Sequence, residues 1–226
     1  MQERRSGFAW KNLDLPNGSV LIAVGGYGRG ELYPYSDVDV LILLEESPDQ
    51  ALQAKLESLI QLFWTLGLTI GHSVRTIDEC LEESANDITV QTSLLEARYI
   101  TGNRKLFQLM RERYNAQMNP SAFFIAKMLE TRQRHVKFGD TPYSLEPNCK
   151  ESPGGLRDLQ VILWTAKAAK LGHSWNQLAR RGLLTPSEAQ QLKKTEEAFK
   201  DIRIRLHIQT QRCEDKLLFD VQIPVA

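Results

Sequence analysis

The strongest constraint on the fold is a glycine-rich loop between two short apolar segments. Residues 19–24 (Ser-Val-Leu-Ile-Ala-Val) are typical of a buried strand, and they lead directly into Gly25-Gly-Tyr-Gly-Arg-Gly30. A turn at Tyr33-Pro-Tyr-Ser36 then precedes Asp37-Val-Asp-Val-Leu-Ile-Leu-Leu44, which has the pattern of a second strand. Because glycine has no Cβ, backbone N–H groups in such a loop can approach another group, such as a phosphate, closely.

The rest of the first half alternates helices with one more strand. An apolar stripe from Leu52 to Leu66 predicts a helix that Ser47-Pro48 opens and Gly67 ends. Residues 68–75 predict a third strand, and Thr76-x-x-Glu79 is a capping box for the next helix. Shorter helices are expected over residues 87–99 and 103–115.

From about Pro120 the pattern becomes helical. Helices are expected over residues 121–137, 156–171 and 187–211, with a stiff proline- and glycine-containing connector between the first two. The chain therefore predicts an α/β domain followed by an all-helical domain, with the boundary near residues 116–120.

Composition narrows the function classes. Lysine plus arginine equals aspartate plus glutamate, 28 against 28, so a nucleic-acid partner is not expected. No apolar run is long enough to span a bilayer, and the N-terminus lacks the apolar stretch of a signal peptide. Cys80, Cys149 and Cys213 are odd in number and widely spaced, which is typical of reduced thiols. We expect a cytoplasmic protein with no membrane partner.

The glycine loop fits neither of two common phosphate-binding motifs. A P-loop needs Gly-x₄-Gly-Lys-Ser/Thr, but Gly30 is followed by Glu31 and Leu32. A dinucleotide fingerprint needs a third glycine or alanine where Glu31 stands, and no helical pattern follows. The remaining interpretations are a phosphate-holding glycine pair upstream of an aspartate pair, or a simple tight turn.

Asp37 and Asp39 are candidate metal ligands. Side chains alternate along a strand, so carboxylates two residues apart project from one face with their Cα atoms roughly 6.5–7 Å apart. That arrangement suits two carboxylates that share divalent cations during displacement at phosphorus. The alternative is that Asp37 is a turn residue and Asp39 a solvent-facing one, but like charges on one face repel unless a cation lies between them.

These motifs together resemble the PII uridylyltransferase family of the nucleotidyltransferase superfamily. The resemblance covers most of residues 20–220. Its segments are Gly-Gly-Tyr-Gly-Arg-Gly-Glu-Leu-x-Pro-x-Ser-Asp-x-Asp (25–39), Gly-His-Ser-Val-Arg-Thr (71–76), Gln-Arg-His (133–135), Leu-Glu-Pro (145–147), Lys-x-Ser-Pro-Gly-Gly-Leu-Arg-Asp (150–158) and Leu-Leu-Phe-Asp (217–220).

The resemblance implies a fold and a reaction. The fold would be a nucleotidyltransferase catalytic domain over residues 1–118, with a short mixed sheet and flanking helices, and a helical domain over residues 119–226 that closes the nucleotide cleft. The chain would move UMP from UTP to a tyrosine of the nitrogen regulator PII and release pyrophosphate. Gly25 and Gly26 would hold the triphosphate, while Asp37 and Asp39 would bind two Mg²⁺ ions and orient the hydroxyl.

Arg29, Ser36 and three basic residues of the helical part are further candidates for nucleotide binding. Arg29 and Ser36 resemble family positions, with contacts expected to phosphate or metal-bound water. Lys127 and Arg134 are seven residues apart on one helix and share a face, which either lines the nucleotide cleft or is a solvated basic face. Arg157 would reach a phosphate or pair with a nearby acid.

One acid of the superfamily pattern is missing. Many nucleotidyltransferases present a third acid from the strand after the first helix, but residues 68–75 contain none. Asp158, from the helical part, is the candidate replacement.

Family members also carry a metal-dependent HD hydrolase domain and two glutamine-sensing ACT domains. The sequence contains no His-Asp dipeptide and stops at Ala226, where the HD region would begin. We therefore expect a piece of a longer enzyme that transfers uridylyl groups but does not remove them. Two alternatives stay open: a related transferase with another nucleotide or acceptor, such as an adenylylating enzyme, and a non-catalytic nucleotide-binding module.

Overall fold

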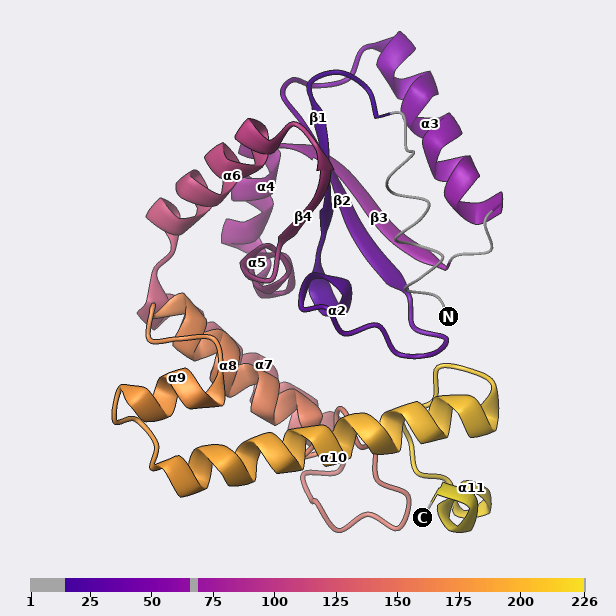
Figure 1. Cartoon of the computed structure of the whole chain (residues 1–226), viewed down its shortest axis with the longest axis vertical. Coiled ribbons are helices and arrows are strands. Elements are labelled where there is room, and N and C mark those ends of the chain that lie inside the picture. The colour runs from indigo at the N-terminus through magenta and orange to yellow at the C-terminus, as the bar shows by residue number, and fades with distance from the viewer. Residues whose placement is uncertain (1–14, 66–68, 226) are drawn as a thin grey trace. The chain divides into compact units, whose positions relative to one another are not determined.

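The computed structural model describes residues 15–65 and 69–225, which form two compact units (Figure 1). Of these described residues, the first unit contains those up to Leu32 and those from Ser36 to Gln117. The second contains those from Met118 to Val225 together with the tripeptide Tyr33–Tyr35. Among the described residues, no helix has both the length and the apolar character needed to cross a bilayer.

A four-stranded mixed sheet forms the centre of the first unit. Its strands are β1 (Ser19–Ala23), β2 (Val38–Leu44), β3 (Ile70–Thr76) and β4 (Arg98–Gly102), in the order β3-β2-β1-β4. β1 pairs antiparallel with β2 and with β4, whereas β2 pairs parallel with β3. The parallel pair requires a crossover, which the helix α3 (Gln50–Thr65) provides.

Helices cover both faces of this sheet, so the two central strands are almost continuously apolar. On one face, Leu56, Leu59 and Phe63 of α3 pack against alternate residues of β1 and β2. The other face is covered by α4 (Ile77–Asn86) and α6 (Arg104–Gln117), and α5 (Ile88–Leu95) packs beside α4 (Figure 1).

The second unit is helical, as the sequence pattern predicts. It consists of α7 (Pro120–Lys137), α8 (Leu156–Ala168), α9 (Trp175–Arg180), α10 (Pro186–Thr210) and α11 (Phe219–Val225). Leu156, Leu159, Trp175 and Leu178 form its core with Ala189 of α10. Tyr33 belongs to the same core, which explains why a tripeptide from the first half of the chain belongs to this unit.

The tripeptide is held by two buried polar residues of α10, Arg203 and His207, and by Asp215, which follows that helix. The Arg203 guanidinium lies 3.9 Å from the centre of the Tyr33 ring, and His207 hydrogen-bonds through Nδ1 to the carbonyl of Pro34. Asp215 joins the two, since it accepts hydrogen bonds from Arg203 at 2.7 and 3.2 Å and contacts Nε2 of His207 at 3.1 Å. Both Arg203 and His207 are almost fully buried.

Several local predictions require correction. The segment 87–99 is not one helix, because α5 ends at Leu95 and β4 begins at Arg98. Ser47 does not cap α3; the Asp49 carboxylate accepts from the Leu52 N–H at 2.7 Å instead. The short helices α9 and α11 were not expected. The predicted helix end at Gly67 and strand start at Leu68 lie outside the described residues.

Candidate active site

The glycine loop forms a single helical turn, α2 (Gly25–Gly28), between β1 and β2. Gly25 has a φ of +55°, which a residue with a side chain rarely adopts. An added Cβ at Gly25 would lie 3.0 Å from Oδ2 of Asp39, and the Val24 N–H donates to the Asp39 carbonyl at 3.1 Å. The start of the loop is therefore fixed directly beside Asp39, and Gly26 follows it.

Asp39 also lies beside Gly71, which belongs to one of the resembling sequence segments but was not expected in the site. The parallel register places Asp39 of β2 beside Gly71 of β3, and an added Cβ at Gly71 would lie only 2.4 Å from Oδ1 of Asp39. The half-buried carboxylate therefore occupies space that side chains at positions 25 and 71 would otherwise fill. This space is a consequence of strand register, which a single sequence does not show.

Asp37 lies immediately before β2, which begins at Val38 rather than at Asp37. Val38 and Val40 are buried in the core beneath α3, so Asp39 lies on the opposite face of the strand. Asp37 is exposed. It stays a prediction that the carboxylates of Asp37 and Asp39 lie on the same face of the strand.

Glu96 and Arg98 contact the backbone of the glycine loop. Arg98 donates to the carbonyls of Tyr27 at 2.7 Å and Gly28 at 3.2 Å, and its guanidinium lies 5.0 Å from the centre of the Tyr27 ring. An added Cβ at Gly28 would lie 2.4 Å from the Glu96 carbonyl oxygen. Sequence reasoning missed these supporting residues because it assigned 87–99 to a helix.

Arg29 and Ser36 flank the loop and the aspartates. Nε of Arg29 pairs with Glu31 at 3.0 Å, and Nη1 pairs with Glu96 at 3.3 Å. Arg29 is therefore already held by two carboxylates, while the half-buried Ser36 has no side-chain hydrogen bond to the described part of the chain. Contact of either residue with a nucleotide stays a prediction.

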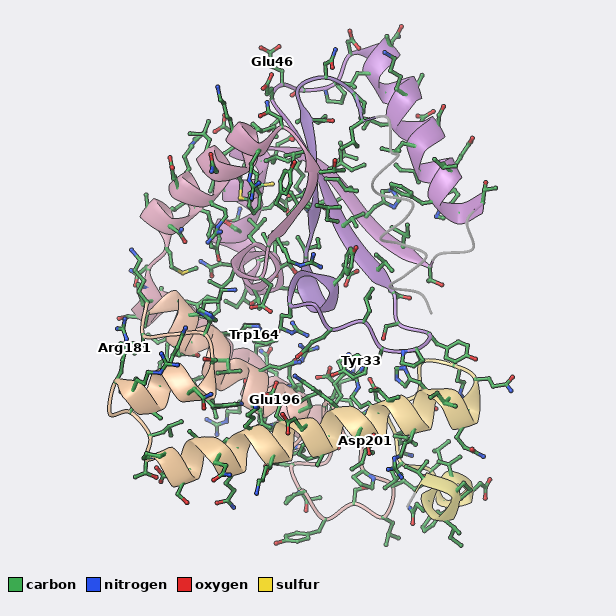
Figure 2. All side chains as sticks on the ribbon, viewed as in Figure 1. Tyr33, Glu46, Trp164, Arg181, Glu196 and Asp201 are labelled. Carbon is green, nitrogen blue, oxygen red and sulfur yellow. The ribbon has the colours of Figure 1, made fainter. Side chains whose placement is uncertain are left out.

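Two of the predicted basic residues of the helical unit, Lys127 and Arg157, contact the ring of Trp164, which Figure 2 labels. The Lys127 ammonium lies 4.8 Å and the Arg157 guanidinium 5.2 Å from the Trp164 ring centre. Burial lowers the pKa of Lys127, and the ion pair with Glu130 opposes part of this shift. Lys127 is buried, so it does not belong to a solvated basic face.

Arg134 and Arg157 are both paired with Glu151. Arg157 contacts its carboxylate at 3.1 Å, and Arg134 donates to its backbone carbonyl at 2.7 Å. The structure thus brings Arg134 and Arg157 together through one acid. Their contact with a nucleotide remains a prediction.

Asp158 is fully engaged within the helical unit. Its carboxylate accepts from Arg134 at 2.5 Å and from the Gly154 N–H at 2.7 Å, and it contacts Nε2 of His135 at 3.0 Å. Burial alone would raise the pKa of Asp158, but the hydrogen bonds from Arg134 and His135 outweigh it and lower the pKa. To serve as the third metal ligand, Asp158 would have to exchange these partners.

Two groups of side chains offer potential metal ligands. Asp37 and Asp39 offer carboxylate oxygens, the ligands that Mg²⁺ prefers. Among the described residues, ligand atoms of His207, Cys213 and Asp215 also lie within 4.8 Å of one another. In that second group, however, Arg203 and Lys150 already neutralise Asp215, so an additional cation would be repelled.

The first unit thus combines a strand, a glycine turn and two aspartates at the start of the neighbouring strand, and the class of protein that it resembles is the nucleotidyltransferases. Residues 9–92 match the family model of the nucleotidyltransferase domain, and residues 122–226 match that of the GlnD PII-uridylyltransferase. The second half of the chain is thus similar to the GlnD PII-uridylyltransferase family, and the first half contains a match to the nucleotidyltransferase domain.

Individual relatives agree with this assignment. The bifunctional uridylyltransferase/uridylyl-removing enzyme of Cupriavidus pinatubonensis is 60% identical over 218 residues, which are 96% of this chain and 25% of that protein. The enzyme of the same name from Burkholderia orbicola is 56% identical over 217 residues, with the same coverage. The chain thus spans about a quarter of the length of these curated relatives.

Similarity to solved structures is weaker. A toxin–antitoxin crystal structure with AMP-PNP has a TM-score of 0.32 and 12% sequence identity, and the match covers 61% of this chain and 96% of that one.

Proposed function

We propose that this chain transfers UMP from UTP to a tyrosine hydroxyl of a PII regulatory protein, with Asp37 and Asp39 as the catalytic carboxylates. The observation that carries the proposal is the position of the Asp39 carboxylate, which lies in the space that side chains at positions 25 and 71 would otherwise fill. Relatives 60% identical to the chain are named uridylyltransferases, which supports uridylyl as the transferred group.

In nucleotidyl transfer, the protein contributes mainly by positioning the reactants and by neutralising charge. The tyrosine oxygen forms a bond to the α-phosphorus of UTP, and the bond from that phosphorus to the pyrophosphate leaving group breaks. Mg²⁺ held by Asp37 and Asp39 would neutralise the charge that develops on the phosphate oxygens. Gly25 and Gly26 present backbone to the triphosphate, and Arg98 holds the carbonyl end of this turn.

We propose cationic contacts to the phosphates from Arg29, Lys127, Arg134 and Arg157, and a contact from Ser36. Arg29 is held by Glu31 and Glu96, which would keep its guanidinium in one position before the nucleotide binds. Removal of uridylyl groups is not assigned to these 226 residues, because none of the four histidines is followed by aspartate.

The test is the intact mass of PII after incubation with the chain, Mg²⁺ and UTP. A parallel reaction with ATP tests the identity of the nucleotide, and an Asp37→Asn/Asp39→Asn variant tests the site. We expect a gain of one uridylyl group per modified PII subunit with UTP, and none with the variant. A gain from ATP alone would replace uridylyl by adenylyl transfer, and an unchanged rate in the variant would refute the assigned carboxylates.

A further inference from the structure

A basic hollow lies where α8 and α9 end, and it is lined by none of the residues assigned to transfer. Its volume is ≈ 390 Å³. That size lies within the range of about 300–1,000 Å³ that small-molecule sites occupy. The residues that line it are Lys167, Lys170, Gly172, His173, Gln177, Arg180 and Arg181.

Charge in this part of the chain is strongly segregated. Acidic and basic residues balance over the whole sequence, yet no aspartate or glutamate occurs between Asp158 and Glu188. The lining of the hollow accordingly contains four permanent cations and no carboxylate. Within the described part of the chain, Lys170, Arg180 and Arg181 form no ion pair. These three cations repel one another where they share a hollow, and a bound anion would relieve that repulsion.

The turn between α8 and α9 has a fixed conformation. Lys170 adopts a left-handed φ of 58°, and the Leu171 N–H donates to the Ala166 carbonyl at 2.8 Å, which closes the end of α8. Gly172 follows with a φ of 140°, and an added Cβ there would lie 3.0 Å from Cβ of Gln177. The turn therefore requires glycine at the point where it passes Gln177.

Two hydrogen bonds to the side chain of Gln177 orient His173. The Gln177 side-chain oxygen accepts from the His173 N–H at 2.9 Å, so the amide nitrogen of Gln177 is the donor to Nε2 of His173 at 3.3 Å. The imidazole of His173 also lines the hollow.

The core of the helical unit determines which face of α9 lines the hollow. Trp175 and Leu178 are buried in that core, and the Trp175 indole N–H donates to Glu196 of α10 at 2.6 Å. Gln177, Arg180 and Arg181 are spaced by three and four residues and therefore share another face.

Helix dipoles explain only part of this arrangement. Cations are favoured in the last turn of a helix, which accounts for Lys167 in α8 and Arg180 in α9. Lys170 and Arg181 lie after the two helices have ended, and they line the same hollow.

We propose that this hollow is a second anion site, which binds a small phosphate-bearing ligand. Lysine and arginine supply charge-assisted hydrogen bonds to phosphate oxygens, and the hollow offers both residue types from two different elements. The phosphate group is the recognised chemistry, whether it belongs to an inorganic polyphosphate or to a nucleotide.

Calorimetric titration with tripolyphosphate tests this proposal, in EDTA so that no divalent cation supports binding at the aspartate pair. The test variant is Lys170→Gln/Arg181→Gln. The matched control is Lys193→Gln/Lys194→Gln, which removes the same charge from exposed positions of α10 in the same unit. Amide NMR spectra of the unaltered chain, recorded during the titration, report whether Gly172 and His173 shift. A second titration with UTP distinguishes the two phosphate sources.

We expect the test variant to bind tripolyphosphate at least about tenfold more weakly than the unaltered chain, while the control changes less than about twofold. Shifts at Gly172 and His173 should saturate with the calorimetric curve. Equal affinity with tripolyphosphate and UTP would assign recognition to phosphate alone, whereas tighter binding of UTP would add nucleoside contacts. Equal weakening in both variants, or no shift at Gly172 and His173, would overturn the site.

Discussion

Replacement of Gly71 by alanine should remove most transfer activity without destabilising the fold. An alanine Cβ would lie 2.4 Å from Oδ1 of Asp39, whereas ordinary contacts of a Cβ begin at 3.4 Å. The carboxylate must therefore move by about 1 Å, and a displacement of that size at a catalytic group costs roughly a hundredfold in rate.

Stability should respond in the opposite sense. Gly71 lies in β3 and is not among the glycines with positive φ, so alanine can adopt its backbone conformation. Exchange of glycine for alanine at such a position stabilises a protein by about 0.4–1 kcal/mol, because the unfolded chain loses freedom. We expect the free energy of unfolding to stay constant or to rise slightly.

The assay pairs the rate of PII mass gain with urea unfolding and with calorimetry of Mg²⁺-dependent UTP binding. Ser73→Ala is the control, since it truncates a side chain two residues along the same strand. Wild-type turnover and wild-type UTP binding in Gly71→Ala would refute the role assigned to the Asp39 position. A large loss of stability would instead show that Gly71 is needed for folding.

Three further predictions concern the supports of the site. Gly28→Ala should lower the free energy of unfolding by about 1–3 kcal/mol in urea titrations, because its Cβ would meet the Glu96 carbonyl at 2.4 Å; an unchanged midpoint would contradict this. Burial would raise the pKa of Asp215, but hydrogen bonds from His207 and Arg203 lower it well below its usual range. Its ionised form therefore stabilises the fold above about pH 4, and this contribution is lost as the pH falls below that value. Asp215→Asn should reduce stability at pH 7 by about 3–5 kcal/mol and flatten the acid side of the stability–pH curve, whereas an unchanged curve would refute the linkage. Asp158→Asn should lower the melting temperature through loss of the Arg134 ion pair, while a changed Mg²⁺ requirement at constant melting temperature would support Asp158 as a metal ligand.

Local sequence signals predicted the elements that position the site. Hydrophobic runs predicted β1 and β2, and the Thr76–Glu79 capping box is present, with both of its reciprocal hydrogen bonds. These features depend on residues close together in the chain, so a single sequence contains them. The same reasoning predicted the helices α7, α8 and α10 to within a few residues.

The parts that were missed depend on contacts between distant segments. β4 is short and only half-buried, so its residues show neither a long apolar run nor a clear alternation, and its pairing with β1 decides its structure. The proximity of Gly71 to Asp39 likewise follows from a parallel register across α3. Asp158 shows the converse case, since its carboxylate looked available in the sequence but is occupied in the fold.

The tripeptide Tyr33–Tyr35 has a consequence for how this chain can be divided. The covalent chain passes between the two units on both sides of the tripeptide and again between Gln117 and Met118. A protein ended at Gln117 would keep Tyr33 but lose Arg203 and His207, and would expose an aromatic side chain four residues before Asp37. A chimera of two relatives with a single junction at Gln117 would therefore combine residues 33–35 of one parent with α10 of the other. A chimera that takes residues 33–35 from the same parent as α10 keeps this cluster of one origin.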